Sequence, residues 1–155
     1  MTLTKAHLSD IPEMQELASE SIKDGTILNR TDDEIATNIR SYVLAKEAGR
    51  LIGYTALHIH SPRLSEIRSL IVDENYRGIS VGKQMVLFAL EEARKLGVEE
   101  VLVLTYLPQF FTKLGFSEIA KESIPEHKIW ADCIKCIHFP ICNEVSLMYK
   151  IDQKS

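Results

Sequence analysis

The segment that most constrains this chain runs from Asp73 to Met85 and reads DENYRGISVGKQM. It places Arg77, Gly78, Ser80 and Gly82 between a strand-like run and a helix-like run. Glycine loses more backbone entropy on folding than any other residue, so a mere connector gains nothing from two of them. A helix that begins directly after such a turn offers backbone N–H groups and a positive dipole end to an anion. The segment therefore predicts a phosphate-binding turn, and a plain tight turn with a solvated arginine is the alternative.

The composition indicates one globular domain, residues 1–155, that acts on small molecules. The chain has 155 residues, 45% of them hydrophobic, which is enough to bury one core. Its formal net charge of −4 argues against a nucleic-acid partner, because phosphate binding needs a basic surface. No run approaches the roughly 18 apolar residues of a membrane span, and the first residues lack the apolar core of a signal peptide. We expect no membrane partner and a cytoplasmic location.

Hydrophobic spacing predicts strands and helices in the order β-α-α-β-β-β-α-β-α-β-β. Strands are expected at residues 3–7, 41–48, 51–60, 64–72, 98–104, 116–120 and 145–151. Helices are expected after the caps Ser9 and Thr31, from Ile79 to Leu96, and after Pro108. Gly49-Arg50 is interpreted as a hairpin turn. Residues 98–104 are interpreted as a buried parallel strand, and residues 145–151 as a half-buried strand.

Two motifs resemble a known family. The stretch EIRSLIVDENYRGISVGKQM, residues 66–85, resembles motif A of the GNAT superfamily of acetyl-CoA-dependent N-acetyltransferases, with the pattern Arg/Gln-x-x-Gly-x-Gly/Ala. Ser80 stands where that family usually has glycine. FFTKLGF, residues 110–116, resembles the second signature of the family. The resemblance implies an α/β fold (α+β in some schemes) with a central mixed sheet of about six to seven strands flanked by about four helices.

Three further stretches narrow the resemblance to one type of GNAT enzyme. DGTILNRT, LTYLPQFFTKLGF and IPEHKIWADCIKCIHFPICNEVSL together resemble the short, single-domain N-acetylglutamate synthase type. This implies acetyl-CoA as cosubstrate and an amino acid, glutamate first, as the acceptor in a ternary complex. It also implies a role in arginine biosynthesis, and a homodimer is left open.

The same resemblance implies which residues hold acetyl-CoA. A backbone N–H within residues 70–72 would hold the thioester oxygen where the strand splays from its neighbour, and the glycine turn would hold the pyrophosphate. The residues expected to bind the cofactor are Leu70, Ile71, Val72, Arg77, Gly78, Ile79, Ser80, Val81, Gly82, Lys83, Phe110 and Phe111.

Glu66 and Tyr106 are the candidate catalytic residues. Several GNAT enzymes carry a glutamate at the position of Glu66, where it takes a proton from the incoming ammonium group. The alternative is a glutamate that pairs with Arg68 or Lys46. Phe111 occupies the position where many GNAT enzymes place a tyrosine acid, so Tyr106 or water would protonate the leaving thiolate, unless no acid is needed. Tyr106 could equally be a packing aromatic.

Cations are needed to receive the carboxylates of an amino acid, and forked guanidinium groups suit them best. Arg30, in the segment that resembles the synthase type, is the first candidate, and Arg68 and Arg77 come after it. His58 could line the same pocket, although a lone histidine on a strand is more often simply hydrogen-bonded in place.

All three cysteines lie close together, as Cys133-x-x-Cys136-x5-Cys142. With His127 or His138 they could complete a structural zinc site, because three thiolates and an imidazole suit tetrahedral zinc. Packing of free thiols and redox pairing of Cys133 with Cys136 are the alternatives. The segment is expected to form a flap on the substrate side or a dimer contact.

Two other functions stay open at this stage. The chain could acetylate another small amine or a protein N-terminus. It could also be a catalytically silent acetyl-CoA sensor, because Phe111 cannot give a proton and Ser80 departs from the usual turn.

Overall fold

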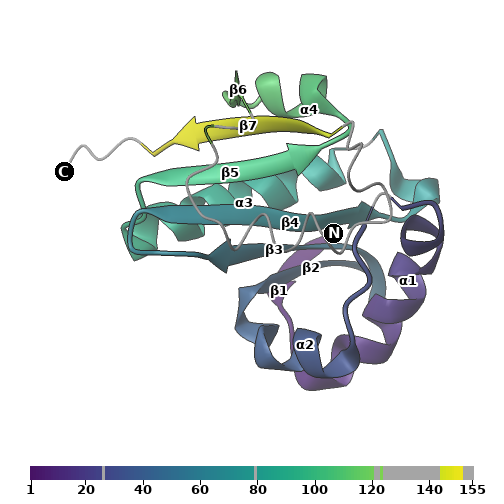
Figure 1. The fold of residues 1–155 in the computed structure, drawn as a ribbon. Helices are drawn as coiled ribbons and strands as arrows, with labels where there is room; N and C mark the ends of the chain where they lie inside the picture. Colours follow the sequence, from purple (N-terminus) through teal and green to yellow (C-terminus); the bar gives the residue numbers. More distant parts are fainter. Residues whose placement is uncertain (26, 79, 121–122, 124–143, 152–155) are drawn as a thin grey trace. The chain divides into compact units, whose positions relative to one another are not determined.

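The computed structural model describes residues 1–25, 27–78, 80–120, 123 and 144–151 (Figure 1). The elements are β1 Thr2–Lys5, α1 Ile11–Lys23, α2 Asp32–Thr37, β2 Tyr42–Glu47, β3 Arg50–Ile59, β4 Leu64–Val72, α3 Val81–Leu96, β5 Glu100–Thr105, α4 Pro108–Thr112, β6 Ser117–Ile119 and β7 Val145–Lys150. Short 3-10 turns lie at Leu8–Asp10, Ile39–Ser41 and Glu74–Tyr76. The predicted order of strands and helices is confirmed.

The described strands form one seven-stranded sheet in the order β1-β2-β3-β4-β5-β7-β6. Together with the four α-helices of the described ranges, this confirms the predicted α/β class. The chain divides into two compact units, which we describe separately. The first contains residues 1–58 and 67–89, and the second contains residues 59–66 and 90–155.

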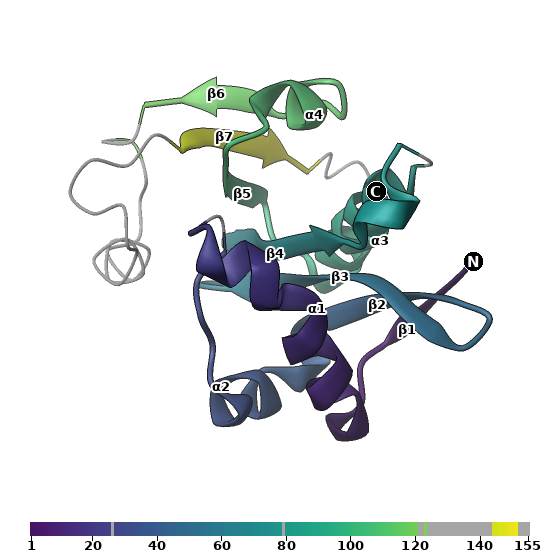
Figure 2. The same cartoon turned by 90° about the vertical axis from the view of Figure 1, so that its right-hand side faces the viewer.

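The first unit has a core on each face of its strands. In β2, Tyr42 and Leu44 belong to a cluster that includes residues of α1 and α2, whereas Val43 and Ala45 belong to a second cluster that includes residues of α3. This follows from the strand period, because successive side chains point to opposite faces. Figures 1 and 2 show α1 and α2 on one side of these strands and α3 on the other.

The turn between β2 and β3 differs from the prediction by one residue. Glu47 pairs with Arg50, so the two turn residues are Ala48 and Gly49 rather than Gly49 and Arg50. Both have a positive φ, 51° and 80°. Two-residue hairpin turns of the type that matches strand twist need this conformation at both positions, and alanine there gave no sequence signal.

Asp10 ties the start of α1 to β2. Its carboxylate accepts a hydrogen bond from the backbone N–H of His7 at 2.8 Å and pairs with the Lys46 ammonium at 3.1 Å. Burial alone would raise the pKa of Asp10, but these two donors outweigh burial and lower the pKa below its ordinary value. The ionised carboxylate therefore stabilises the folded first unit.

The second unit is built around β7, which pairs antiparallel with β5 and with β6. Ser146, Leu147 and Met148 are all buried, so the prediction of a half-buried strand is wrong. β7 lies between β5 and β6 in the sheet, and the burial of these successive residues shows that both of its faces are covered. Met148 packs with Leu102, while Tyr149 stacks at 5.2 Å on the buried Phe116.

In the part of the chain that the structure describes, none of the helices is long and apolar enough to cross a membrane.

Replacing Asp10 by asparagine should lower the free energy of unfolding at neutral pH by roughly 1–3 kcal/mol, because the charge-assisted bonds to His7 and Lys46 are weakened. The folded-state pKa is depressed, so the stabilisation is present above the unfolded value and is lost as pH falls through the folded one. The difference between the two proteins should thus shrink below about pH 4 in denaturant titrations. Glu118→Gln removes the same charge from an exposed edge strand and should change little; a pH-independent Asp10→Asn deficit would contradict the account.

Candidate functional site

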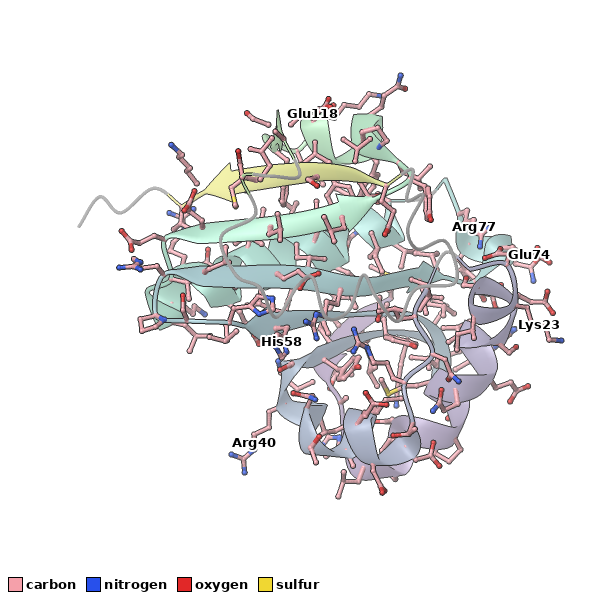
Figure 3. The ribbon with its side chains drawn as sticks, viewed as in Figure 1. Lys23, Arg40, His58, Glu74, Arg77 and Glu118 are labelled. Carbon is pink, nitrogen blue, oxygen red and sulfur yellow. The ribbon has the colours of Figure 1, made fainter. Side chains whose placement is uncertain are left out.

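The turn after β4 is fixed at its base by polar contacts. Asp73 pairs with Arg50 at 3.2 Å and accepts the backbone N–H of Asn75 at 2.9 Å. Arg77 Nε donates to the backbone carbonyl of Val72 at 3.2 Å. These contacts hold the turn against the end of the strand, and Figure 3 shows Arg77 and Glu74 projecting from it.

The turn itself takes a left-handed path into α3. Gly78 has a φ of +84° and Ser80 a φ of +65°. A Cβ on Gly78 would meet nothing within 4 Å, so the space outside this residue is open to a ligand. The Gln84 N–H donates to the Ser80 carbonyl at 3.0 Å, and the N–H groups before it in α3 have no acceptor within a helix that begins at Val81. A turn of this kind can cradle a pyrophosphate, and the binding of acetyl-CoA at this turn stays a prediction.

Ser80 adopts the conformation that glycine would adopt more easily. For a residue with a Cβ, the left-handed region costs roughly 1–2 kcal/mol. The Ser80 hydroxyl accepts a hydrogen bond from the Gln84 side chain at 3.3 Å, which offsets part of that cost. Ile79, also predicted to bind the cofactor, lies outside the described residues.

Strand β4 is irregular just before the turn. Ser69 has a φ of 56° in the middle of the strand. The buried Thr55 hydroxyl donates to the Arg68 carbonyl at 2.9 Å, and a Cβ on Gly53 would lie only 2.9 Å from the Ile71 carbonyl. Both features show that the backbone of β4 departs from a regular ladder at 68–71. The predicted role of the N–H groups of residues 70–72 is compatible with this path and stays a prediction.

A pocket of about 300 Å³, open solvent at its mouth included, lies in the first unit. It brings together Arg30, His58 and Arg68, the three residues predicted to bind the acceptor, from segments far apart in sequence. Figure 3 shows His58 on the strand side, with Arg40 projecting away. The full lining is Arg30, Glu34, Asn38, Ser41, Tyr42, Ala56, His58 and Arg68.

The wall of this pocket is held by hydrogen bonds of α1 and α2. The Gln15 side chain donates to the Arg30 carbonyl at 2.8 Å. At the start of α2, Thr31 and Glu34 form a reciprocal capping box, with bonds of 3.0 and 3.1 Å. The predicted cap at Thr31 is confirmed, and it fixes the start of the helix that carries Glu34 at the pocket.

The pocket lining contains one aromatic residue, Tyr42. Burial raises the pKa of the Tyr42 hydroxyl, an effect that the Arg30 and Arg68 guanidiniums offset only in part. Burial also raises the pKa of Tyr54, whose ring meets the Tyr42 ring edge-on at 5.7 Å. Tyr42 therefore stays protonated at neutral pH and can donate a hydrogen bond. The pocket combines two guanidiniums, one carboxylate and several neutral polar groups.

In the second unit, Glu66 is buried and bonded to a histidine that the sequence did not single out. Its Oε1 lies 2.8 Å from His60 Nε2, and the two side chains are 8% and 0% exposed. Lys46, one of the partners considered for Glu66, pairs with Asp10 instead. A histidine six residues before a strand glutamate, across a turn with Pro62, was the available signal.

The aromatic residues after β5 have different surroundings. Tyr106 is partly buried directly after the strand. Phe111 is 2% exposed and packs edge-on against Phe110 at 5.0 Å and Phe116 at 5.2 Å. Phe111 thus belongs to the core of the second unit, and the roles of Tyr106 and Phe110 stay predictions.

The predicted zinc ligands Cys133, Cys136 and Cys142 lie outside the described residues. Within the described ranges, no group of three or more His, Cys, Asp or Glu side chains is placed to hold a metal ion.

Sequence and structure comparisons agree with this geometry. The sequence profile of the acetyltransferase (GNAT) family matches residues 7–116. The chain is 34% identical over 143 residues to an uncharacterized N-acetyltransferase of Chlorobaculum tepidum, covering 92% of each chain. It is 30% identical over 118 residues to an amino-acid acetyltransferase of Mycobacterium tuberculosis, covering 74% of this chain and 67% of that one. The chain therefore belongs to the acetyltransferase (GNAT) family of acetyl-CoA-dependent N-acetyltransferases.

Solved structures share the fold. The N-acetylglutamate synthase of Neisseria gonorrhoeae, in complex with coenzyme A and N-acetyl-glutamate, superposes with a TM-score of 0.86 at 21% identity. That match covers 97% of this chain, which spans about a third (35%) of the Neisseria chain. A Mycobacterium tuberculosis protein in complex with CoA superposes with a TM-score of 0.83 at 21% identity, covering 98% of this chain and 100% of that one.

Gly78 and Gly97 form a matched pair for testing the cofactor cradle. They flank α3, have φ values of +84° and +87°, and have no neighbour within 4 Å of an added Cβ. Replacing either by alanine should cost about 1 kcal/mol of stability, since both backbones are left-handed. Only Gly78→Ala should weaken binding of coenzyme A, by several-fold in calorimetry, because its new methyl group enters the ligand's space. If both variants bind coenzyme A with equal affinity, the turn is not part of the binding site.

Proposed function

We propose that this chain transfers the acetyl group of acetyl-CoA to the α-amine of an amino acid, with L-glutamate as the first candidate. The observation that carries this proposal is the pocket that joins Arg30 and Arg68 with neutral hydrogen-bonding groups in a GNAT chain. The amino-acid acetyltransferase of Mycobacterium tuberculosis and the Neisseria N-acetylglutamate synthase support it as similar proteins. The product would enter arginine biosynthesis, and residues 1–155 would act as one acetyltransferase domain.

The acceptor would be held by its carboxylates. Arg30 and Arg68 present forked donors, the geometry that matches a carboxylate with two parallel hydrogen bonds. Tyr42, protonated in its buried site, and His58 add donors that fix the orientation of the acceptor. The Glu34 carboxylate in the same lining disfavours acceptors that would place a negative charge next to it.

The cofactor would lie along the β4–α3 segment. The pyrophosphate would rest on the N–H groups at Gly78, Ile79, Ser80, Val81 and Gly82, with Arg77 and Lys83 at the rim. A backbone N–H of Leu70, Ile71 or Val72 would bind the thioester oxygen, and preorganised donors of this kind contribute about 3 kcal/mol to a transition state. Phe110 would contribute apolar surface, with the buried Phe111 ring packed edge-on behind it.

Glu66 would act as the general base. It takes a proton from the ammonium group of the bound amino acid, directly or through one water. The amine lone pair then forms the C–N bond with the thioester carbonyl carbon, and the C–S bond breaks as the tetrahedral centre collapses. The electron pair leaves on sulfur, and the thiolate takes up a proton from Tyr106 or water. The attacking nitrogen gives up its second proton, which restores the group that protonated the thiolate. The transfer is direct, within a ternary complex.

Thiol release from acetyl-CoA across a panel of amino acids and simple amines tests this proposal. Glutamate should give the highest kcat/KM. Glu66→Gln should lower kcat by about 10²- to 10⁴-fold with binding of acetyl-CoA unchanged, since a general base contributes that range. Glu118→Gln, an exposed edge residue, is the matched control and should behave as the wild type. If the protein binds acetyl-CoA but turns over no amine, the proposal is overturned and the function of a catalytically silent acetyl-CoA sensor is favoured. If it prefers an amine that is not an amino acid, the proposed acceptor is wrong.

Acceptor recognition can be tested separately with arginine variants. Arg68→Gln and Arg30→Gln should raise KM for the amino acid by about 10- to 100-fold, because a charge-assisted bond contributes about 1.5–3 kcal/mol. KM for acetyl-CoA should stay the same. Arg40→Gln is the control, since Arg40 is exposed and projects away from the pocket (Figure 3). An equal rise in KM with Arg40→Gln would show that the effect is only one of net charge.

A further inference from the structure

We propose that His60 is a positioning residue for Glu66, holding the carboxylate in one orientation for proton transfer from the acceptor amine. This inference rests on the proposed function, because it assigns a partner to the proposed base. No sequence motif points to His60. The geometry of the second unit identifies it.

The β3–β4 hairpin brings the two side chains together. The backbone N–H groups of His60 and Ser61 both donate to the Leu64 carbonyl, at 3.0 and 3.1 Å, which closes a tight turn. The Ser61 hydroxyl accepts the Leu64 N–H at 3.0 Å and braces the same turn. Glu66 follows two residues later along β4, so the register places its carboxylate against the imidazole. The pairing is therefore built into the turn rather than made by two mobile surface groups.

Burial makes this contact energetically important. The His60 side chain is fully buried and that of Glu66 is 8% exposed, with Nε2 and Oε1 at 2.8 Å. A carboxylate in such surroundings is costly unless it is hydrogen-bonded. A distance of 2.8 Å is typical of a charge-assisted hydrogen bond. Removing the imidazole would thus leave a buried carboxylate without this donor.

The chemistry of the two groups sets the direction of the bond. An ionised carboxylate can only accept hydrogen bonds, so when Glu66 is ready to act as a base, Nε2 of His60 carries the hydrogen. One carboxylate oxygen is then committed to the imidazole, and this fixes the direction of the other. A base that is already oriented needs no rearrangement at the moment of proton transfer. His60 therefore acts through Glu66 and does not itself exchange a proton with the substrate.

Two substitutions that differ by one methylene separate this role from simple packing. His60→Gln places an amide N–H near the position of Nε2 and keeps a donor to Glu66, whereas the shorter His60→Asn does not reach. We expect His60→Asn to lower kcat at least 10-fold with binding of coenzyme A unchanged, and His60→Gln to retain most of kcat. His7→Gln, at a side chain that is 80% exposed, is the control for loss of a histidine.

The pH dependence of kcat/KM provides a readout that a packing defect does not give. Loss of the donor makes the charged carboxylate less favourable, so the acid limb of the profile should shift in His60→Asn and stay in place in His60→Gln. The charged groups of the same hairpin and of the neighbouring strand, Arg63, Arg68 and Glu100, are the same in all variants. The shift is then assigned to His60.

The outcomes separate this inference from the proposed function. If the wild type acetylates no amine, the proposed function fails, and this inference fails with it. If the wild type is active and Glu66→Gln is not, but folded His60→Asn matches the wild type in kcat and in its acid limb, only the role of His60 is overturned. Ring nitrogen NMR signals of His60 give a check without turnover: they should change in Glu66→Gln, and unchanged signals would contradict the pairing.

Discussion

The departure of β4 from a regular strand is the constraint on which the site depends. Ser69 takes a left-handed conformation that costs roughly 1–2 kcal/mol. The buried Thr55 hydroxyl holds the carbonyl of the preceding residue, and the absence of a side chain at Gly53 makes room for the carbonyl of Ile71. Thr55 and Gly53 of β3 thus accommodate the irregular backbone of β4. Strain of this kind is often found at functional sites.

The groups proposed to carry out the reaction lie one after another along β4 and the turn that follows it. Glu66 comes first as the proposed base, Arg68 reaches the pocket two residues later, and the irregular backbone and the left-handed turn come next. One strand therefore supplies the proposed base, one acceptor contact and the entrance to the cofactor cradle. With these three proposed functions on one strand, a chain of 155 residues can combine them.

Local signals in the sequence were sufficient for the order of the elements and for the left-handed turn before α3. The expected cap at Ser9 was wrong, because α1 begins after Asp10. The capping box at Thr31, the bounds of β4 and the end of α3 at Leu96 are short-range features and were predicted correctly. The left-handed Ser69 was not predicted, because tertiary neighbours decide it. The His60 contact to Glu66 was not predicted either, because it depends on the geometry of the turn between the two residues. The burial of both faces of β7 was also missed. Its alternating sequence is typical of a half-buried strand and does not reveal that the rest of the fold covers both faces.

The central claim is direct transfer, in which amino acid and acetyl-CoA are bound at the same time. Initial rates over a matrix of acetyl-CoA and glutamate concentrations test it most directly, together with a mass measurement of the protein after acetyl-CoA alone. The account predicts intersecting lines in a double-reciprocal plot and a protein of unchanged mass. Parallel lines and a protein that gains an acetyl group would show a covalent acetyl-enzyme, and they would contradict Glu66 acting as the base for direct attack.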